Sequence, residues 1–306
     1  MSLYFPIAEM SLNVLLLLFM GGGVGFLSGM FGIGGGFLMT PLLIFTGVPP
    51  AVAVATEANQ ITASSVSGAL AHFRRSGIDI KMGLVLMAGG LGGSYVGAEI
   101  FSYLNSIGQV DLMISLAYVF FLGTIGSLML WENVSPWLAR KSGRRVRRRR
   151  KRHPAWIHAW PHKMKFKKSH LVVSIYLPIL IGFVVGVLAA IMGVGGGFVM
   201  IPALIYILGM PGNVVVGTSL FQIVFVTAMV TFFHSVNTQT VDVVMALVLL
   251  SGGVIGAQLG ARAGYKLKAE QFRTGLAVLV LVVCFKMGWD LFTTPAELYS
   301  VIEVAR

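Results

Sequence analysis

Long stretches without a charged residue occupy most of this 306-residue chain. Lys, Arg, Asp and Glu are all absent from residues 11–56, 82–98, 112–130, 171–240 and 243–261. A helix needs about 20 apolar residues to cross the roughly 30 Å hydrocarbon core of a bilayer, so several stretches are long enough for two crossings. Only 11% of the residues are charged, against about 25% in globular domains. The sequence therefore predicts an all-α integral membrane protein.

An internal repeat divides the chain. MFGIGGGFLMTP at residues 30–41 returns as IMGVGGGFVMIP at residues 191–202. Later pairs such as Pro49 with Pro211, and Asp79 with Asp242, follow at nearly the same offset. We predict about ten helical segments, in a first transmembrane repeat at 11–131, a basic linker at 132–170 and a second repeat at 171–292. The segments are about 11–31, 34–46, 51–72, 82–103 and 110–131, then 171–191, 195–208, 213–234, 243–263 and 272–292.

An odd number of segments in each half inverts the second repeat relative to the first. The same holds if the first two segments only dip into the membrane and return together. Lys and Arg accumulate in cytoplasmic loops. The inverted arrangement puts three basic segments on one side of the membrane: the linker, residues 73–81 and residues 261–273. The loops on the other side, 103–111 and 234–242, contain no Lys or Arg. We expect a multi-pass protein of the cell (inner) membrane, with the 132–170 loop cytoplasmic and both termini extracytoplasmic.

The formal charge of +12 is local. Between Arg140 and Lys168 there are 14 Lys or Arg and no acid. Nucleic-acid binding is one interpretation of such a loop, but beside membrane spans we favour contact with anionic lipid. We expect the bilayer and a small anion as partners, no nucleic acid, and a homodimer as one option for assembly. The single cysteine, Cys284, can form no internal disulfide.

Consecutive glycines interrupt the first segment pair of each half. Glycine costs about 1 kcal/mol relative to alanine inside a helix, and the apolar run after each GxGGGF is too short to cross at 1.5 Å per residue. A helix that begins inside the membrane presents free N–H groups and the positive end of its dipole, which together bind anions. The predicted ligands are the amides of Gly34, Gly35, Gly36, Gly195, Gly196 and Gly197.

Close helix packing is the alternative function for these glycines. It is the predicted function of Gly89, Gly93, Gly97, Gly252, Gly256, Gly260 and Gly264, whose spacing of four residues is typical of helix contacts in membranes.

Symmetric polar side chains follow the breaks. Gln60 and Gln222 lie about 13–14 Å into the third segments, near the midplane, and Thr56 and Thr218 share their helix faces. We expect these four residues, with Ser219, to line the substrate site. Hydrogen bonding between helices is the alternative.

Three ionisable residues remain in these segments. Glu57 stands where the second half has Ser219. A desolvated carboxyl binds a proton readily, so Glu57 is a proton-coupling candidate, although a position at a wetted helix end is equally open. His72 and His234 lie about 18 Å beyond the glutamines, at opposite membrane faces, as gate or interfacial anchor residues.

Motifs for other chemistry are missing from the sequence. It has no HExxH, no GxSxG, no paired catalytic carboxylates and no Cys/His metal spacing. No Lys-Ser/Thr follows the glycines, which excludes a nucleotide-binding P-loop. We therefore expect no enzyme, no cofactor and no metal.

These motifs resemble the TauE/SafE sulfite exporter family, also called the TSUP transporters. The resemblance rests on GMFGIGGGFLMTPLL with IMGVGGGFVMIPALI, on AVATEANQ with VVGTSLFQ, and on the GG…GA helices at 89–98 and 252–261. It implies transport of a small sulfur-containing or carboxylated anion, such as sulfite, a sulfonate or sulfoacetate, coupled to a proton gradient. Together with the inverted repeats, it leads us to expect a secondary active transporter of the sulfite or sulfonate class that works by alternating access. It also implies substrate contacts at both GGG runs, Gln60 and Gln222. The chain departs from the family's usual Thr-Ser pair at Thr56 and Glu57. A passive anion channel, or a membrane anchor whose basic loop recruits a partner, are the alternatives.

Overall fold

The computed structural model describes residues 2–31, 35–74, 77–141, 162–169, 171–263 and 269–293. The first half contains β1 (Ser2–Phe5), β2 (Met10–Asn13), α1 (Val14–Phe31), α2 (Gly36–Phe45), α3 (Pro50–Phe73), α4 (Ile80–Ser106) and α5 (Val110–Lys141). The second half contains β3 (Lys163–Phe166), β4 (Leu171–Ser174), α6 (Tyr176–Met192), α7 (Gly197–Pro202), η2 (Ala203–Ile207), α8 (Gly212–Phe233), η3 (His234–Thr238), α9 (Val243–Ala263) and α10 (Ala269–Phe292). The turns η2 and η3 are π-helical and continue α7 and α8.

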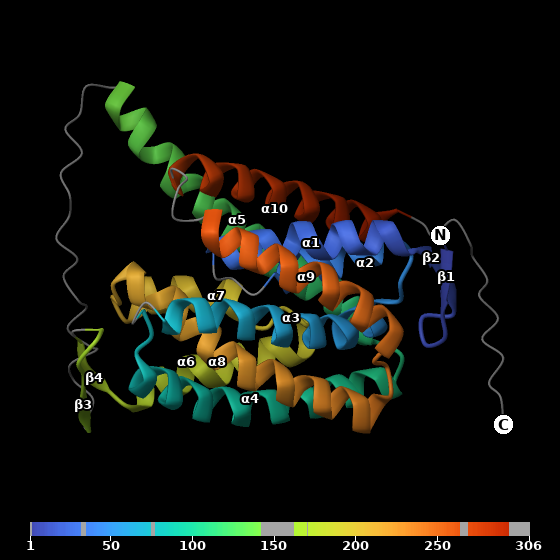
Figure 1. Cartoon of the computed structure of the whole chain (residues 1–306), viewed down its shortest axis with the longest axis horizontal. Helices are drawn as coiled ribbons and strands as arrows, with labels where there is room; N and C mark the ends of the chain where they lie inside the picture. Colours follow the sequence, from blue (N-terminus) through green and yellow to red (C-terminus); the bar gives the residue numbers. More distant parts are fainter. Residues whose placement is uncertain are drawn as a thin grey trace.

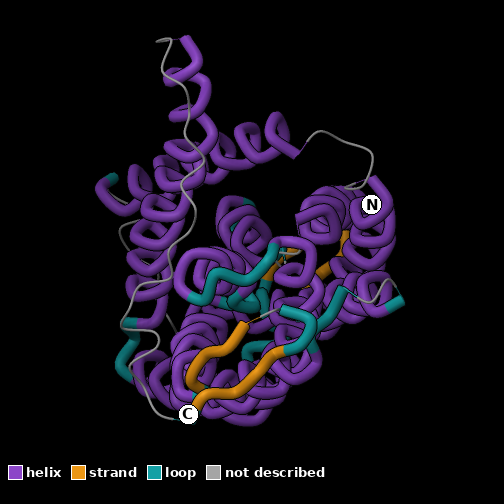
Figure 2. The backbone as a smooth tube through the Cα atoms, turned by 90° about the vertical axis from the view of Figure 1, so that its left-hand side faces the viewer, coloured by secondary structure: helices purple, strands orange, loops and turns teal. Residues whose placement is uncertain are grey.

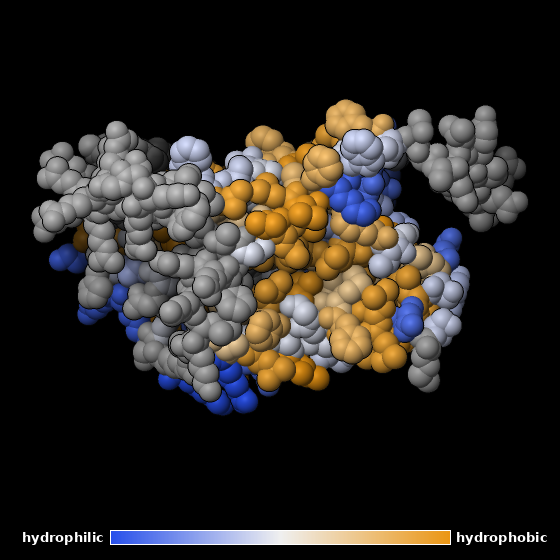
Figure 3. All heavy atoms as spheres, turned by 90° about the horizontal axis from the view of Figure 1, so that it is seen from above, coloured by the Kyte–Doolittle hydropathy of each residue, from blue (hydrophilic) through white to orange (hydrophobic). Residues whose placement is uncertain are grey.

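The helices confirm the predicted all-α membrane fold. In the described part of the chain, five of them, α4, α5, α8 with η3, α9 and α10, are long and apolar enough to cross a membrane. Apolar residues cover the middle of the face seen in Figure 3, and hydrophilic residues gather toward its ends. Large side chains such as Phe19, Phe120 and Phe285 are exposed on the outside of the bundle, where lipid would cover them.

Helices of the two halves pack against each other in a pseudo-symmetric pattern. The first helix of each half packs along the fourth helix of the other, which gives the pairs α1–α9 and α4–α6. Between these pairs, α3 packs on α8, and α5 packs on α10 at one side of the bundle (Figure 1). Figure 2 looks along this bundle from the end that carries β3 and β4.

Glycine stripes allow the two pairs to approach closely. A Cβ on Gly93 of α4 would overlap the carbonyl oxygen of Phe183 in α6, and one on Gly260 of α9 would overlap that of Phe26 in α1. The packing function predicted for these stripes is confirmed, since only the missing side chain permits backbone contact at such points.

Each broken helix pair enters the bundle and returns to the same end. Gly47, just after α2, lies beside Met10, just before α1. In the second half, Leu208 and Met210 share a buried cluster with Phe166 and Leu171. The pairs α1–α2 and α6–α7 therefore each return to the end of the bundle at which they begin, as re-entrant helices do.

A short β-hairpin precedes the first helix of each half, which the sequence analysis did not predict. The two hairpins lie at opposite ends of the molecule (Figure 1), and each is held by an aspartate. Asp79 accepts hydrogen bonds from the backbone N–H of Ser169 at 3.0 Å and its hydroxyl at 2.7 Å, while it caps α4 at Met82. Asp242 likewise caps α9 and accepts from Ile7 at 3.1 Å.

The hairpins extend beyond the predicted repeats at 11–131 and 171–292. The strand β1 starts before residue 11, and β3 and the end of α5 lie inside the interval assigned to the linker, 132–170. Four-residue strands have no hydropathy pattern comparable to that of a membrane span, which is why the sequence did not reveal them. Most of the basic loop, 142–161, lies outside the described residues.

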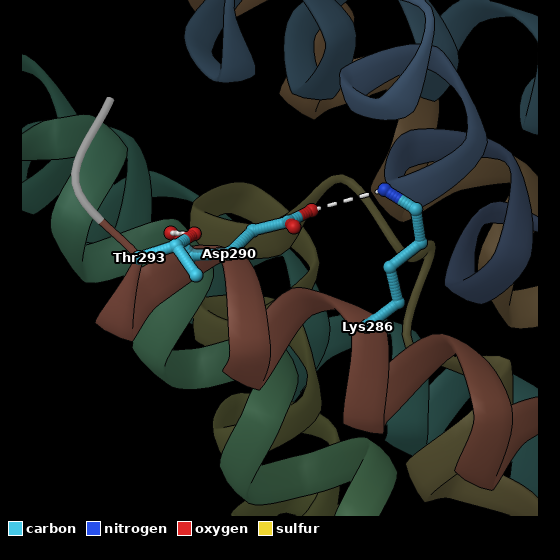
Figure 4. A network of polar contacts seen from close by, with 3 residues as sticks. All are labelled: Lys286, Asp290 and Thr293. Carbon is cyan, nitrogen blue, oxygen red and sulfur yellow. Dashed lines mark hydrogen bonds and ion pairs between the residues drawn. The ribbon is translucent and has the colours of Figure 1, made fainter. Parts of the chain in front are cut away.

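A charged pair marks the last turns of α10 (Figure 4). The Lys286 ammonium lies 3.1 Å from the Asp290 carboxylate and 4.0 Å from the centre of the Phe45 ring. Both charged side chains are about half exposed, at 54% and 52%. Long side chains near a helix end reach toward the membrane boundary in this way.

Candidate functional site

The two glycine breaks meet at the centre of the bundle. A Cβ on Gly36, the first residue of α2, would lie 2.6 Å from the carbonyl oxygen of Gly193. The rings of Phe37, which follows Gly36, and of Phe198, which follows Gly197, stack with centroids 4.6 Å apart and planes 4° apart. Ile61 of α3 contacts both Gly36 and Gly195. We call this region the crossing.

Left-handed backbone conformations produce the breaks. The φ angles are 81° at Gly35, 69° at Gly195 and 76° at Gly196, a region that residues with a side chain rarely adopt. The N-cap residues of α2 and α7, Gly35 and Gly196, have no side chain that could cap these helices. The amides at these two buried starts are therefore of the kind that a helix leaves unsatisfied. Gly34 lies outside the described residues.

Gln60 and Gln222 are buried with unsatisfied amides. Neither side chain has a hydrogen-bond partner for its oxygen or its nitrogen. Gln60 packs against Gly253 of α9, whereas Gln222 packs against Gly90 of α4, so each amide lies beside a different helix pair. An unsatisfied buried polar group costs about 1–3 kcal/mol, and such groups in native proteins commonly await a ligand or water.

Thr56 and Thr218 make hydrogen bonds between the halves. The Thr56 hydroxyl accepts from the backbone N–H of Asp242, and the Thr218 hydroxyl accepts from that of Asp79, each at 3.0 Å. Ser219 donates to the carbonyl of Val216 within its own helix. The Thr56 and Thr218 hydroxyls thus join helix ends of the two halves, whereas the Ser219 hydroxyl bonds only within α8.

Glu57 is fully buried, with an exposure of 0%. Both of its carboxyl oxygens lack a hydrogen-bond partner. The structure therefore places Glu57 inside the bundle and not at a wetted helix end.

Tyr118 of α5 is a residue that sequence reasoning missed. Its hydroxyl donates to the carbonyl oxygen of Met192 at 2.7 Å and approaches that of Gly36 at 3.3 Å. It therefore bridges the end of α6 and the start of α2, directly at the crossing. One signal in the sequence could have revealed it. Tyr118 is a lone tyrosine in an apolar span, and a buried tyrosine hydroxyl usually finds a hydrogen-bond partner.

The two histidines lie away from the crossing's centre. His234 is buried; its Nε2 lies 3.0 Å from the carbonyl oxygen of Ala190, and its ring meets the Phe101 ring edge-on. His72 lies in the last turn of α3, where it neighbours Gly217 of α8. Within the described residues, no three His, Cys, Asp or Glu side chains are grouped to hold a metal.

Re-entrant helices whose uncapped starts meet inside a two-fold repeated helical bundle are typical of membrane transporters. The family model described as "Sulfite exporter TauE/SafE" matches residues 17–287. The chain belongs to this family, as its motifs indicated, and it is a multi-pass membrane transporter.

Curated relatives agree with this assignment. The "probable membrane transporter protein YunE" of Bacillus subtilis is 28% identical over 294 residues, covering 89% of this chain and 97% of the relative. YjnA of the same organism is 26% identical over 91% of this chain and 100% of its own length. A probable membrane transporter protein of Xylella fastidiosa is 25% identical, covering 88% of this chain and 92% of the relative. No solved structure matches the chain significantly.

Proposed function

We propose that this protein is a secondary active transporter for a small sulfur-containing anion of the sulfite or sulfonate class, driven by a proton gradient. The observation that carries the proposal is the crossing, where two uncapped helix starts from opposite halves come together. The sulfur-containing class follows from the description of the family.

Backbone amides suit a substrate that must also be released. Phe37, Ile61 and Phe198 contribute apolar side chains to the crossing. An anion there would be held by the dipoles and N–H groups of α2 and of the helical run Gly197–Ile207. The unsatisfied amides of Gln60 and Gln222 supply further donors from the two sides.

Alternating access would arise from motion between packed units. The glycine contacts join α1 to α9 and α4 to α6, which makes each pair a rigid body that contains parts of both repeats. Rocking of one pair against the other, around α3 and α8, would open the crossing to one membrane face at a time.

The charge distribution favours the proposed orientation. Basic residues gather at the end of the bundle that carries β3 and β4, where α3 and α9 end and α4 begins (Figure 1). They are Arg74, Lys81, Lys163 and Arg262. This end is the cytoplasmic one if the positive-inside rule holds, which leaves the N-terminal hairpin outside.

The experiment is uptake into proteoliposomes with an imposed pH gradient, comparing sulfite, sulfoacetate, taurine and sulfate. We expect one anion to accumulate against its gradient. Gln60→Ala and Gln222→Ala should weaken its apparent affinity by about 10- to 100-fold, the equivalent of one hydrogen bond to a charged ligand. Gln109→Ala, in an exposed loop, is the matched control.

Two other results would contradict the proposal. Flux that only equilibrates each anion would indicate a passive channel. The absence of flux for all four anions would exclude the substrate class.

A further inference from the structure

Glu57 faces the crossing from α3. A Cβ on Gly193 would touch the backbone of Val54, and one on Gly36 would overlap the side chain of Ile61. Glu57 lies three residues after Val54 and four before Ile61, and residues at these spacings share a helix face. The carboxyl group is thus directed toward the same two breaks.

Thr40 lies opposite Glu57. The helices α2 and α3 are consecutive and antiparallel, and Gly36 of α2 meets Ile61 of α3. Thr40 lies one turn after Gly36, and Glu57 lies one turn before Ile61. The two residues are therefore at the same level of the bundle. The Thr40 hydroxyl is fully buried and makes no hydrogen bond of good geometry. Two unsatisfied polar groups therefore lie at the same level of the bundle.

Tyr118 completes the group. Its hydroxyl lies beside that of Thr40 and near Glu57. Tyr118 has one proton to donate, and the shorter of its two hydrogen bonds goes to Met192. While Tyr118 donates to Met192, it donates no hydrogen bond to Thr40 or Glu57.

We propose that Glu57, Thr40 and Tyr118 form one proton-binding site whose protonation state decides whether Tyr118 ties the two breaks together. The inference rests on the proposed function and names the residues that couple it to protons. When Glu57 is neutral, Tyr118 donates to Met192 and holds α6 to α2. When Glu57 loses its proton to the water-filled side, the buried carboxylate requires donors.

The hydroxyls of Tyr118 and Thr40 are the donors available to that carboxylate. A hydrogen bond to a carboxylate is about twice as strong as one to a neutral carbonyl, so Tyr118 turns from Met192 to Glu57. No covalent bond changes apart from the transfer of the Glu57 proton. Loss of the tie frees the helix starts that would hold the anion.

Other titratable groups on the surrounding elements have their own partners. Asp242 accepts from the backbone of Ile7 and Met245, and His234 is bonded to the Ala190 carbonyl on α6. Asp111 begins α5 beside the backbone of Ala51. Glu57 is the buried carboxyl in this region whose two oxygens both lack a partner.

The test compares Glu57→Gln, Tyr118→Phe and Thr40→Val in proteoliposomes, with the exposed Tyr95→Phe as the matched control. Two rates are measured for each: accumulation driven by a pH gradient, and exchange of labelled for unlabelled anion without a gradient. We expect the ratio of driven accumulation to exchange to fall at least tenfold in Glu57→Gln and several-fold in Tyr118→Phe and Thr40→Val. The ratio in Tyr95→Phe should equal that of the wild type.

Wild-type ratios in Glu57→Gln and Tyr118→Phe would overturn the inference and leave the proposed transporter standing. A second measurement needs no transport. Infrared spectra of the purified protein should contain a carboxylic acid C=O band that vanishes in Glu57→Gln and shifts in Tyr118→Phe and Thr40→Val. A band that is absent, or that Tyr118→Phe leaves in place, would overturn the inference even if no anion is moved.

Discussion

At the scale of the residue, glycine has two separate functions in this chain. Gly35, Gly195 and Gly196 adopt positive φ angles that produce the breaks. Gly25 and Gly93 lie within regular helices and are needed because a neighbouring backbone occupies the space of a side chain. The first group shapes the crossing, and the second joins the helix pairs.

Alanine substitutions at Gly23 and Gly25 of α1 would distinguish the effect of helix packing from that of helix propensity. A Cβ on Gly25 would overlap the backbone of Gly253, whereas one on Gly23 would meet nothing within 4 Å. Gly25→Ala should destabilise the protein by about 1–3 kcal/mol, as overpacking does, and lower the thermal unfolding temperature in detergent. Gly23→Ala should leave that temperature unchanged or raise it. Equal effects of the two substitutions would contradict the packing account.

Single residues also show what a sequence can predict about the site. The depth of Gln60 and Gln222 followed from counting along a helix, and both are buried. The partners of Thr56 and Thr218 could not be predicted, because each bonds a backbone N–H far away in the chain. Tyr118 was missed for the same reason: its acceptors, Gly36 and Met192, are adjacent only after the halves have packed.

At the scale of the element, the breaks and most helices were predictable and the hairpins were not. Apolar spans and consecutive glycines are strong local patterns, so the starts of α2 and α7 were expected. The hairpins depend on distant carboxylates, Asp79 and Asp242, rather than on their own short strands. A hairpin this short is not stable alone.

Each aspartate should therefore control one hairpin. Asp79→Ala removes the cap of α4, which costs about 0.5–2 kcal/mol, and it removes the oxygen that accepts both hydrogen bonds from Ser169. We expect faster hydrogen–deuterium exchange at the Ser169 amide and through β3 and β4, with β1 and β2 unaffected. Asp242→Ala is the matched control and should show the reverse pattern, beginning at Ile7 and Ala8. Uniform exchange changes in both variants would show that the hairpins are held by other contacts.

At the scale of the whole molecule, the proposed orientation requires the two ends of the bundle to face opposite sides of the membrane. Ser106 and Lys167 are exposed at the two ends of the bundle. With Cys284 replaced by serine, Ser106→Cys should react with a membrane-impermeant maleimide on intact spheroplasts. Lys167→Cys should react only after permeabilisation. The opposite labelling would reverse the proposed orientation, and labelling of both from outside would argue against the membrane topology.

The proposed function requires that the two helix starts at the crossing bind one anion. The most direct measurement is a crystal structure with a selenium analogue of the transported anion, located by its anomalous scattering in protein that contains ordinary methionine. The account predicts one strong peak between the starts of α2 and α7, within hydrogen-bond distance of backbone amides near Gly36 and Gly197. A peak remote from both helix starts, for example beside the basic residues at the end that carries β3 and β4, would contradict it.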